Sequence, residues 1–569
     1  MSVTSAVREH APQPTRSRWV ALVVVLSAVF MQLLDTTIVT VAIPSIQDDL
    51  GASFGMVQLV LAGYSLTFAC TLITGGRLGD SFGRRRLFMI GMIGFVLASA
   101  LCGAAPNALT LVIARLLQGM CSGLMFPQVL AIIQALFDDT DRPKALGAYG
   151  ASIGLATISG PVLGGALIAA DLWGADWRSI FYINLPIGVL ALIGAMRVVP
   201  ETYGGQGRRL DLVGALLVTA GLFLLVLPLV VGRDQGWPAW TFVLLAASGP
   251  VLAAFAWYEH RLGVRPGSDP LVRTSLFARR SFSLGLAVSL VFFAGIPSFF
   301  FIFILTLQAG FGYSAVGAGV VTLGFAIFVA VGSARSSAVV RKIGTRTLSV
   351  GTGLLVLGIT GVLVTLHAAG TDLHGYQLVP SLAIAGAGAG LFLAPVTGVI
   401  IAGLPQREAG SASGVLATAQ QVGAALGVAI VGVLFFGLLG SNAERSTAAV
   451  TPALQVRLAA AHIPAPQRDA IVHGFDTCFT DRAHAKDPAA LPQSCRDLQE
   501  RAAALPAPVR ARVSDAVLGH ALPDARRHNF SRSLQQSLSW QLGVFGASFL
   551  LVLALPRVRG ANVAAVPAA

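Results

Sequence analysis

The stretch MQLLDTTIVTVAIP, residues 31–44, places an aspartate, Asp35, near the end of a run that is otherwise apolar from Trp19 onward. A carboxylate in the middle of a hydrocarbon layer costs several kcal/mol unless a neighbouring group compensates its charge. Chains therefore keep an acid at such a depth mainly where its charge or its proton is used. Both the fold and the function depend on whether this stretch crosses a membrane.

Composition indicates that it does. Of the 569 residues, 55% are hydrophobic and only 11% are charged, and the mean hydropathy is +0.75, which excludes a soluble protein of this size. The hydrophobic segments do not alternate in polarity as the strands of a membrane β-barrel do. We therefore expect an all-α polytopic membrane protein.

Fourteen apolar stretches are long enough to cross about 30 Å of hydrocarbon as helices, which takes about 20 residues each. Prolines inside them, such as Pro161, Pro186 and Pro395, are tolerated because neighbouring helices satisfy the freed backbone groups. The predicted spans are residues 18–42, 55–75, 86–105, 109–133, 145–170, 179–199, 211–231, 241–260, 283–309, 315–337, 346–366, 378–402, 411–437 and 538–556.

Basic residues mark alternate loops. They lie in the N-terminal tail, in GRRR after the second span, in residues 260–280 after the eighth and in RKIGTR after the tenth. Basic loops stay on the cytoplasmic side, so we expect a multi-pass protein of the inner (cytoplasmic) membrane with both termini in the cytoplasm. The net charge of +13 then reflects topology rather than nucleic-acid binding. The polar tail is not expected to be a cleaved signal peptide.

The chain carries an internal duplication. Three groups of residues recur at a nearly constant separation: Gly119, Gly123 and Pro127 as Gly386, Gly390 and Pro395; Gly160 and Gly164 as Gly423 and Gly427; and Gly83 as Gly344. Duplicated helical halves are typical of secondary transporters, whose site lies between the halves near the midplane. Spans 1–6 and 9–14 would form the halves, with spans 7 and 8 inserted. Arg115 matches Leu382 and Asp80 matches Arg341, so the charged groups gather in the first half.

Five motifs carry a resemblance to a known family. GGRLGDSFGRRRLF (75–88) resembles the loop signature GxLxDxxGRR of the major facilitator superfamily, and ASIGLATISGPVLGGALI (151–168) resembles the GPxxGG signature of its drug:proton antiporters. Further motifs of the fourteen-helix antiporters, the QacA and EmrB kind, are similar to LDTTIVTVAIPSIQDDL (34–50), RLLQGMCSGLMFP (115–127) and WRSIFYINLPIG (177–188). The resemblance implies the major facilitator fold, with two six-helix halves plus two inserted helices. It also implies proton-driven efflux of lipophilic or cationic small organic compounds by alternating access.

Seven segments follow from this organisation. They are a cytoplasmic tail (1–17), the N-terminal six-helix half (18–200), the inserted pair with its linkers (201–280), helices 9–13 (281–437), an extracytoplasmic loop (438–537), the last helix (538–556) and a second cytoplasmic tail (557–569). The loop contains Cys478 and Cys495. An oxidising exterior favours pairing of nearby thiols, so we expect a disulfide there; two free thiols in a mobile loop are the alternative. Amphipathic pieces such as LQVRLAAAHI predict short helices over the outer mouth.

Asp35 and Arg115 are the predicted proton-coupling pair. Each lies about 10 Å below the same membrane surface if its helix rises 1.5 Å per residue, so the two side chains could pair or compete for one proton. Burial would raise the pKa of an unpaired acid and a nearby arginine would lower it, which suits a group that loads and releases a proton. The alternative is a static ion pair that only holds helices 1 and 4 together.

The loop signature predicts a cytoplasmic gate formed by Gly76, Asp80, Gly83 and Arg84. The glycines would allow close backbone approach, and Asp80 would face a helix N-terminus, for which the GSASG start of helix 13 is the dock that the family implies. Such a contact is worth a fraction of a kcal/mol to about 2 kcal/mol, which suits a latch that must open. The alternative is that the arginines only set topology.

Helix 5 should allow another helix to approach and slide, because its small residues leave one face without side chains. Pro161 should favour a bend there. The alternative is ordinary small-residue packing. The residues of this predicted antiporter motif are Gly154, Gly160, Pro161, Gly164 and Gly165.

A drug cavity would combine aromatic and polar side chains. Three phenylalanines share one face of helix 9, and such faces bind planar or cationic organic molecules; lipid-facing phenylalanine is the alternative. The candidate substrate contacts are Phe292, Phe299, Phe303, Gln32, Gln118, Gln420 and Gln421.

Other classes of function have little support. The nine histidines show no metal-ligand spacing, and no nucleotide-binding loop or catalytic triad occurs. We therefore expect no enzyme activity, no metal and no cofactor, with a proton gradient as the energy source and a monomer as the working unit. The partners would be a small-molecule substrate, protons and membrane lipid, and no nucleic acid. An exporter of a lipid or an endogenous metabolite is the first alternative, and a non-transporting membrane sensor or scaffold is the second.

Overall fold

The computed structural model of the chain describes residues 15–138, 141–203, 211–232, 235–265, 270–272, 274–401, 406–485 and 491–556. The helices that make up the spans are α1 (Thr15–Leu50), α2 (Phe54–Phe82), α3 (Arg84–Gly103), α4 (Ala108–Leu136), α5 (Arg142–Ala170), α6 (Ser179–Tyr182), α7 (Asn184–Val198), α8 (Leu212–Val231), α9 (Ala239–Val264), α10 (Arg280–Leu305), α11 (Ala315–Ile343), α12 (Arg346–Ala369), α13 (Gly375–Leu393), α14 (Val396–Ile401), α15 (Gln406–Ser441) and α20 (Leu522–Leu553). Four more helices lie between α15 and α20: α16 (Ala443–Ala460), α17 (Ala465–His484), α18 (Gln493–Ala503) and α19 (Ala507–Ser514). Short turns are η1 (Leu172–Gly174), η2 (Asp176–Arg178), η3 (Thr274–Ala278), η4 (Thr306–Gly310) and η5 (Asp515–Ala521).

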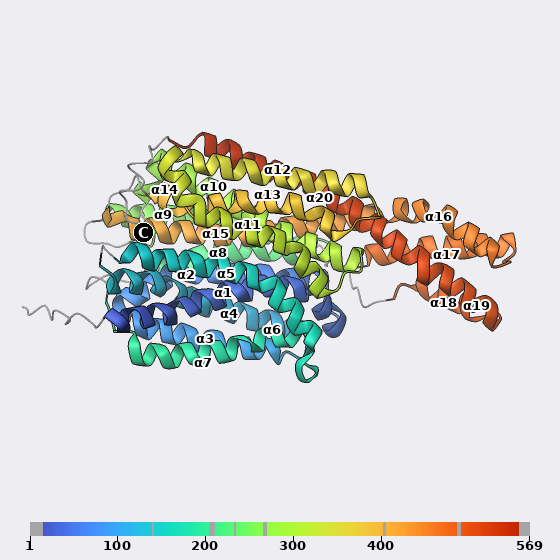
Figure 1. Cartoon of the computed structure of the whole chain (residues 1–569), viewed down its shortest axis with the longest axis horizontal. Coiled ribbons are helices and arrows are strands. Elements are labelled where there is room, and N and C mark those ends of the chain that lie inside the picture. Colours follow the sequence, from blue (N-terminus) through green and yellow to red (C-terminus); the bar gives the residue numbers. More distant parts are fainter. Residues whose placement is uncertain are drawn as a thin grey trace, which may run out of the picture.

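The spanning helices form one elongated bundle (Figure 1). Helix α1 begins and α20 ends at the same end of this bundle, which we call the terminal face. Helices α16 to α19 extend beyond the opposite end, which we call the cap face. The N-terminal half (α1–α7) and the C-terminal half (α10–α15 with α20) lie next to one another.

Membrane-crossing length is met along the whole bundle. In the described part of the chain, thirteen helical segments are long and apolar enough to cross a membrane. The remaining predicted span is α5, whose described apolar segment is Ser159–Ala170. Only 11% of the apolar window of α9 is buried, against 61% in α10, so the inserted pair α8–α9 lies at the outside of the bundle.

The duplicated glycines make equivalent contacts in the two halves. In the N-terminal half, Gly123 of α4 is so close to the Phe68 carbonyl of α2 that a Cβ would lie 2.8 Å from its oxygen. In the C-terminal half, a Cβ at Gly390 of α13 would collide with the Val329 carbonyl of α11. The same residue type therefore sets the same close helix approach in both copies.

A second repeated pair behaves in the same way. A Cβ at Gly164 of α5 would lie 2.7 Å from the Ile38 side chain of α1, and a Cβ at Gly427 of α15 would collide with the Ala294 carbonyl of α10. The matching turns also agree, because Gly83 (φ +104°) and Gly344 (φ +59°) both have positive φ, which glycine adopts without strain. The duplication in sequence is therefore a duplication in structure.

The two halves touch near the cap face. A Cβ at Gly165 of α5 would lie 2.8 Å from the backbone of Val316, which is in the first turn of α11. Gln308 in the turn after α10 donates a hydrogen bond to the Val41 carbonyl of α1 (3.1 Å). These contacts close the space between the halves on the side of the cap.

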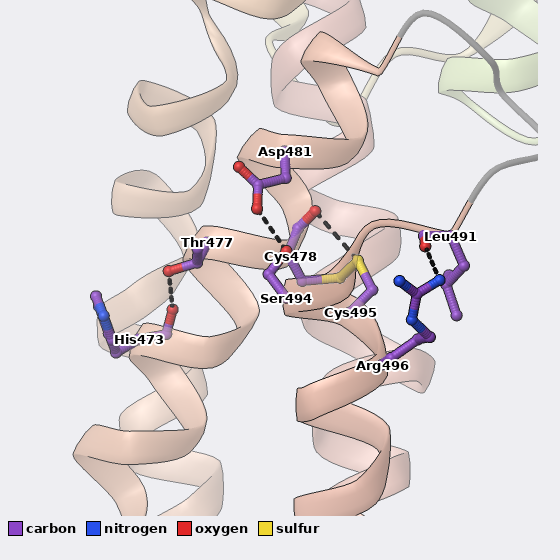
Figure 2. Close-up of a disulfide and its surroundings, with 8 residues drawn as sticks. All are labelled: His473, Thr477, Cys478, Asp481, Leu491, Ser494, Cys495 and Arg496. Atoms are coloured by element: carbon purple, nitrogen blue, oxygen red, sulfur yellow. Dashed lines mark hydrogen bonds between the residues drawn. A yellow bond between two sulfur atoms is a disulfide. The ribbon is translucent and has the colours of Figure 1, made fainter.

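The cap has its own small apolar core, formed by residues such as Leu454, Leu458, Phe475 and Val513. A disulfide joins Cys478 of α17 to Cys495 of α18, the pair that the sequence predicts (Figure 2). The described part of residues 438–537, the predicted extracytoplasmic loop, is thus largely helical.

Two predicted span ends differ from the structure. Helix α1 runs to Leu50 rather than to residue 42, and α20 begins at Leu522 rather than at residue 538. Hydropathy misses the first part of α20 because its buried face is polar. Asn529 donates to the Leu439 carbonyl (3.0 Å), and Ser533 accepts from Asn442 (3.1 Å). Polar groups that bond to protein need not be apolar in order to be buried.

Candidate functional site

Asp35 lies in the middle of α1 and is completely buried. The Arg115 guanidinium of α4 donates from Nη1 to Asp35 Oδ2 at 2.5 Å. Arg115 is only 1% exposed, so neither charge is neutralised by water. Helix α1 continues past residue 42, so the depth expected for Asp35 used the wrong helix end; the structure nevertheless brings the two side chains together.

Two amides complete the carboxylate's partners. Gln118 Nε2 donates to Asp35 Oδ1 at 2.9 Å, and Asn184 Nδ2 donates to the same oxygen at 3.0 Å. Gln118 also accepts from Arg115 Nη1 (2.7 Å), so it bridges the acid and the base. Three helices, α1, α4 and α7, therefore hold one carboxyl group between them. Gln118 thus belongs to this cluster, and its contact with substrate stays a prediction.

Arg115 has partners besides Asp35. Its Nε donates to the Val60 carbonyl of α2 (3.1 Å), and its Cζ lies 4.2 Å from the ring centroid of Tyr64. A cation over an aromatic face is attracted by about 1 to 2 kcal/mol when water is excluded. The Tyr64 hydroxyl lies 3.0 Å from Ser122 Oγ. The guanidinium can thus remain partly satisfied if Asp35 loses its charge.

The position of Asn184 follows from its motif, residues 177–188. Trp177 Nε1 and Arg178 Nη1 both donate to Asp49 Oδ2 near the end of α1, at 3.0 and 2.5 Å. This fastens the motif to α1 on the cap side. Asn184 begins α7, and its amide reaches both Asp35 and Ser99 Oγ of α3 (3.0 Å). The motif in sequence predicts no role for Asn184, because only the fold shows that it faces Asp35.

The predicted gate residues lie mainly within α2, which continues to Phe82. Gly76 and Gly79 are therefore helical and not in a loop, and they face α4. A Cβ at Gly79 would collide with the Gln128 side chain, which donates to the Gly75 carbonyl (2.8 Å). Only Gly83 lies between α2 and α3.

Asp80 forms an ion pair within its own half. Arg84 Nη2 donates to Asp80 Oδ1 at 2.8 Å, and Arg84 Nη1 donates to the Ala131 carbonyl of α4 at 3.2 Å. The predicted dock, GSASG at residues 410–414, lies partly outside the described side chains, so the latch between the halves stays a prediction.

A different acid occupies a helix N-terminus here. Glu201, which follows α7, accepts from the backbone of Arg85 (2.9 Å) and of Arg86 (3.2 Å) at the start of α3. A carboxylate at this position is favoured by the free N–H groups and the helix dipole. Glu201 was not predicted, because it lies far from α3 in the chain.

Helix α5 presents its small residues to two neighbours. A Cβ at Gly160 would collide with Thr37 of α1, and Gly319 of α11 lies against the Pro161 carbonyl. Gly164 and Gly165 likewise face α1 and α11. The helix continues through Pro161. The side of α5 at Gly154 lies outside the described side chains.

The candidate cavity residues are distributed between the halves. Phe292 is buried and stacks on Phe392 of α13 (3.8 Å between centroids), and Phe299 stacks on Phe303 (5.1 Å). These rings are inside the C-terminal half rather than on lipid. Gln32 is buried, and its amide oxygen has no hydrogen-bond partner among the described residues. Gln420 and Gln421 are half-buried on α15.

Comparisons with known proteins agree with this architecture. The family model described as Major Facilitator Superfamily matches residues 25–428. The chain is 40% identical to the probable actinorhodin transporter of Streptomyces coelicolor, over 96% of this chain and 93% of that protein. It is 35% identical to the puromycin resistance protein of Streptomyces alboniger, over 81% and 88%, and 33% identical to the tetracenomycin C resistance and export protein of Streptomyces glaucescens, over 74% and 77%.

Solved structures support the same fold. A bacterial homologue of the human lysosomal transporter Spinster, in an inward-facing and unoccupied conformation, aligns with a TM-score of 0.59 at 16% identity, covering 95% of this chain and 98% of that one. A POT family transporter in complex with 5-aminolevulinic acid aligns with a TM-score of 0.55 at 15% identity, over 74% and 91%. The protein is a multi-pass membrane protein, and it belongs to the major facilitator superfamily.

Proposed function

We propose that this protein exports small organic compounds, such as antibiotics, from the cytoplasm in exchange for protons. The compounds would be lipophilic or cationic. The relatives support export, since they include an actinorhodin transporter, a puromycin resistance protein and a tetracenomycin C resistance and export protein. Coupling to protons rests on the chemistry of the site.

The observation that carries the proposal is the state of Asp35. It is fully buried and bonded to a single cation, Arg115, in a chain that must move a substrate through this bundle. A proton on Asp35 would remove the charge that holds Arg115. Arg115 could then rest on the Tyr64 ring and the Val60 carbonyl, and the bonds between α1 and α4 would weaken. Loading and release of the proton would thus bias the halves between two arrangements.

The orientation follows from charge and from the disulfide. The terminal face carries Arg84 to Arg86, and basic segments remain in the cytoplasm. The cap, with its Cys478–Cys495 bond, would lie in the oxidising exterior. Substrate would enter from the cytoplasm, with Gln32, Gln420, Gln421 and the phenylalanines of α10 as its proposed contacts.

Inverted membrane vesicles test the proposal. A fluorescent cationic dye is added outside vesicles that contain the protein, and dye uptake into the lumen is followed with and without an imposed pH gradient. We expect uptake that needs an acidic lumen and stops when a protonophore collapses the gradient. Uptake that is driven by ATP, or that is indifferent to the gradient, would contradict proton coupling. Puromycin and dye should compete if both use one site.

A further inference from the structure

Two carboxyl groups meet inside the inserted pair, away from the Asp35 site. Asp211 precedes α8 and Glu259 lies near the end of α9, both towards the terminal face. Asp211 is only 8% exposed and Glu259 only 1% exposed. The transport mechanism proposed above uses neither of them.

One oxygen of each carboxyl has a backbone donor. Glu259 Oε2 accepts from the Val272 amide at 2.8 Å, and Asp211 Oδ1 accepts from the Gly214 amide at 2.8 Å. The other two oxygens, Glu259 Oε1 and Asp211 Oδ2, are buried and have no hydrogen-bond donor among the described residues. Both would collide with a Cβ at Gly214, so they lie beside the same point in space.

Two carboxylates at this distance would repel one another if both were ionised, and the charged and titratable neighbours do not remove this repulsion. Tyr258 of α9 interacts with Asp211, and Arg265 lies near Tyr258. Arg77 of α2 is the cation that acts on Glu259, and its Nη2 donates to the Pro270 carbonyl. Glu259 Oε1 and Asp211 Oδ2 therefore both remain beside Gly214.

Two ionised carboxylates cannot lie together in a buried site without a large repulsion, so one of such a pair keeps its proton. A single proton placed between the two unpartnered oxygens converts the repulsion into a short O–H···O⁻ hydrogen bond, which is among the strongest in proteins. It also satisfies both buried acceptors at once.

We propose that Asp211 and Glu259 form a second proton-binding site, in which one shared proton holds residues 270–272, which follow α9, in place. Residues 270–272 connect Glu259 to α2, because the Val272 amide donates to Glu259 and the Pro270 carbonyl accepts from Arg77 of α2. Loss of the proton forces the two carboxylates apart and draws Glu259 away from Val272. The contact between residues 270–272 and α2 therefore depends on the pH at the terminal face.

Infrared difference spectroscopy of the purified full-length protein tests the shared proton directly and needs no transport. The wild type should show a protonated-carboxyl C=O band at neutral pH that disappears on alkaline titration. Glu259→Gln and Asp211→Asn should each lose this band, because the introduced amide donates to the remaining carboxylate in place of the proton. Asp35→Asn should keep it. A wild-type spectrum indistinguishable from that of Glu259→Gln at every pH would overturn the proposal.

Thermal unfolding gives the second readout. Because the wild type must hold a proton at this pair to stay in the observed arrangement, its midpoint should fall as the pH rises through the titration of the infrared band. Glu259→Gln should unfold at a midpoint that lacks this fall. Asp372→Asn, which alters an exposed acid near the cap face, should keep the wild-type pH dependence. A fall that persists in Glu259→Gln, or a wild-type midpoint that depends on sodium or potassium instead of pH, would contradict a shared proton.

Discussion

The two halves of the bundle share their helix packing but differ in what they bury. Around α1 and α4 the N-terminal half buries an ion pair, Asp35 with Arg115. At the position that matches Arg115, the C-terminal half has Leu382, which is also fully buried. Its interior near α10 is aromatic, with Phe292 stacked on Phe392.

This difference separates the requirements of the fold from those of the function. The helix approaches are set in both halves by glycines at matching positions, such as Gly123 and Gly390. An apolar interior is compatible with this packing, as the C-terminal half shows. A buried ion pair is seldom needed for stability, since apolar replacement of a whole pair is often neutral or stabilising. The charges in the N-terminal half are therefore best explained by their use.

The largest expected effect is that of Asp35→Asn on uphill transport. An amide keeps the size of a protonated carboxyl but cannot exchange a proton, so efflux driven by a pH gradient should be abolished while substrate binding survives. Asp35→Glu should keep part of the activity because the titratable group remains. Gradient-driven dye transport in vesicles at equal protein content measures the activity of both variants. Full gradient-dependent transport by folded Asp35→Asn protein would exclude Asp35 as the coupling acid.

Arg115→Leu should produce the next largest effect, because it places the residue of the matching position beside an intact Asp35. One buried charge would lose its partner, which typically costs about 3 to 5 kcal/mol. We expect a lower yield of folded protein and a lower thermal midpoint in detergent. The double variant Asp35→Asn with Arg115→Leu should recover much of this loss, since no unpaired charge remains. Equal damage in the single and double variants would show that Arg115 stabilises the half independently of Asp35.

The shared packing can be tested with a matched pair, Gly123→Ala and Gly390→Ala. In each case the added methyl would press on a carbonyl of the neighbouring helix, and overpacking of this kind costs about 1 to 3 kcal/mol. The two variants should lower the thermal midpoint similarly. Gly543→Ala in α20 is the control, because a Cβ there meets no atom within 4 Å and alanine favours a helix by up to about 1 kcal/mol. Damage in only one half would refute equivalent packing.

Much of the fold follows from the sequence because its causes are local. Apolar length gives the spans, and the repeated glycines give the helix pairs. The end of α1 at Leu50 and the start of α20 at Leu522 were not predicted, since helices continue beyond the hydrocarbon wherever protein partners take up their polar groups. In α20, Asn529 has such a partner in the Leu439 carbonyl.

The candidate site was predicted less completely because it depends on convergence of distant segments. Asp35 and Arg115 stood out, since charge is rare in apolar spans. Nothing local marks Asn184 as a donor to Asp35. Likewise nothing near α3 in the sequence marks Glu201 as the acid at its N-terminus. A contact between residues more than a hundred positions apart leaves no pattern in a single sequence.

The smallest expected effect concerns Asp80, the gate acid whose matching residue in the C-terminal half is Arg341. In the arrangement described here, Asp80 pairs with Arg84, and the halves touch near the cap. If Asp80 also faces a helix N-terminus when the terminal ends of the halves meet, loss of its charge removes about 1 kcal/mol from that arrangement alone. This shifts a two-state equilibrium about five-fold. Asp80→Asn should therefore remain folded and transport several-fold more slowly, as measured by initial dye efflux at equal expression. Asp372→Asn, a charge-matched change near the cap face, should transport at the wild-type rate. If Asp80→Asn did so too, the asymmetry between Asp80 and Arg341 would have no role in gating.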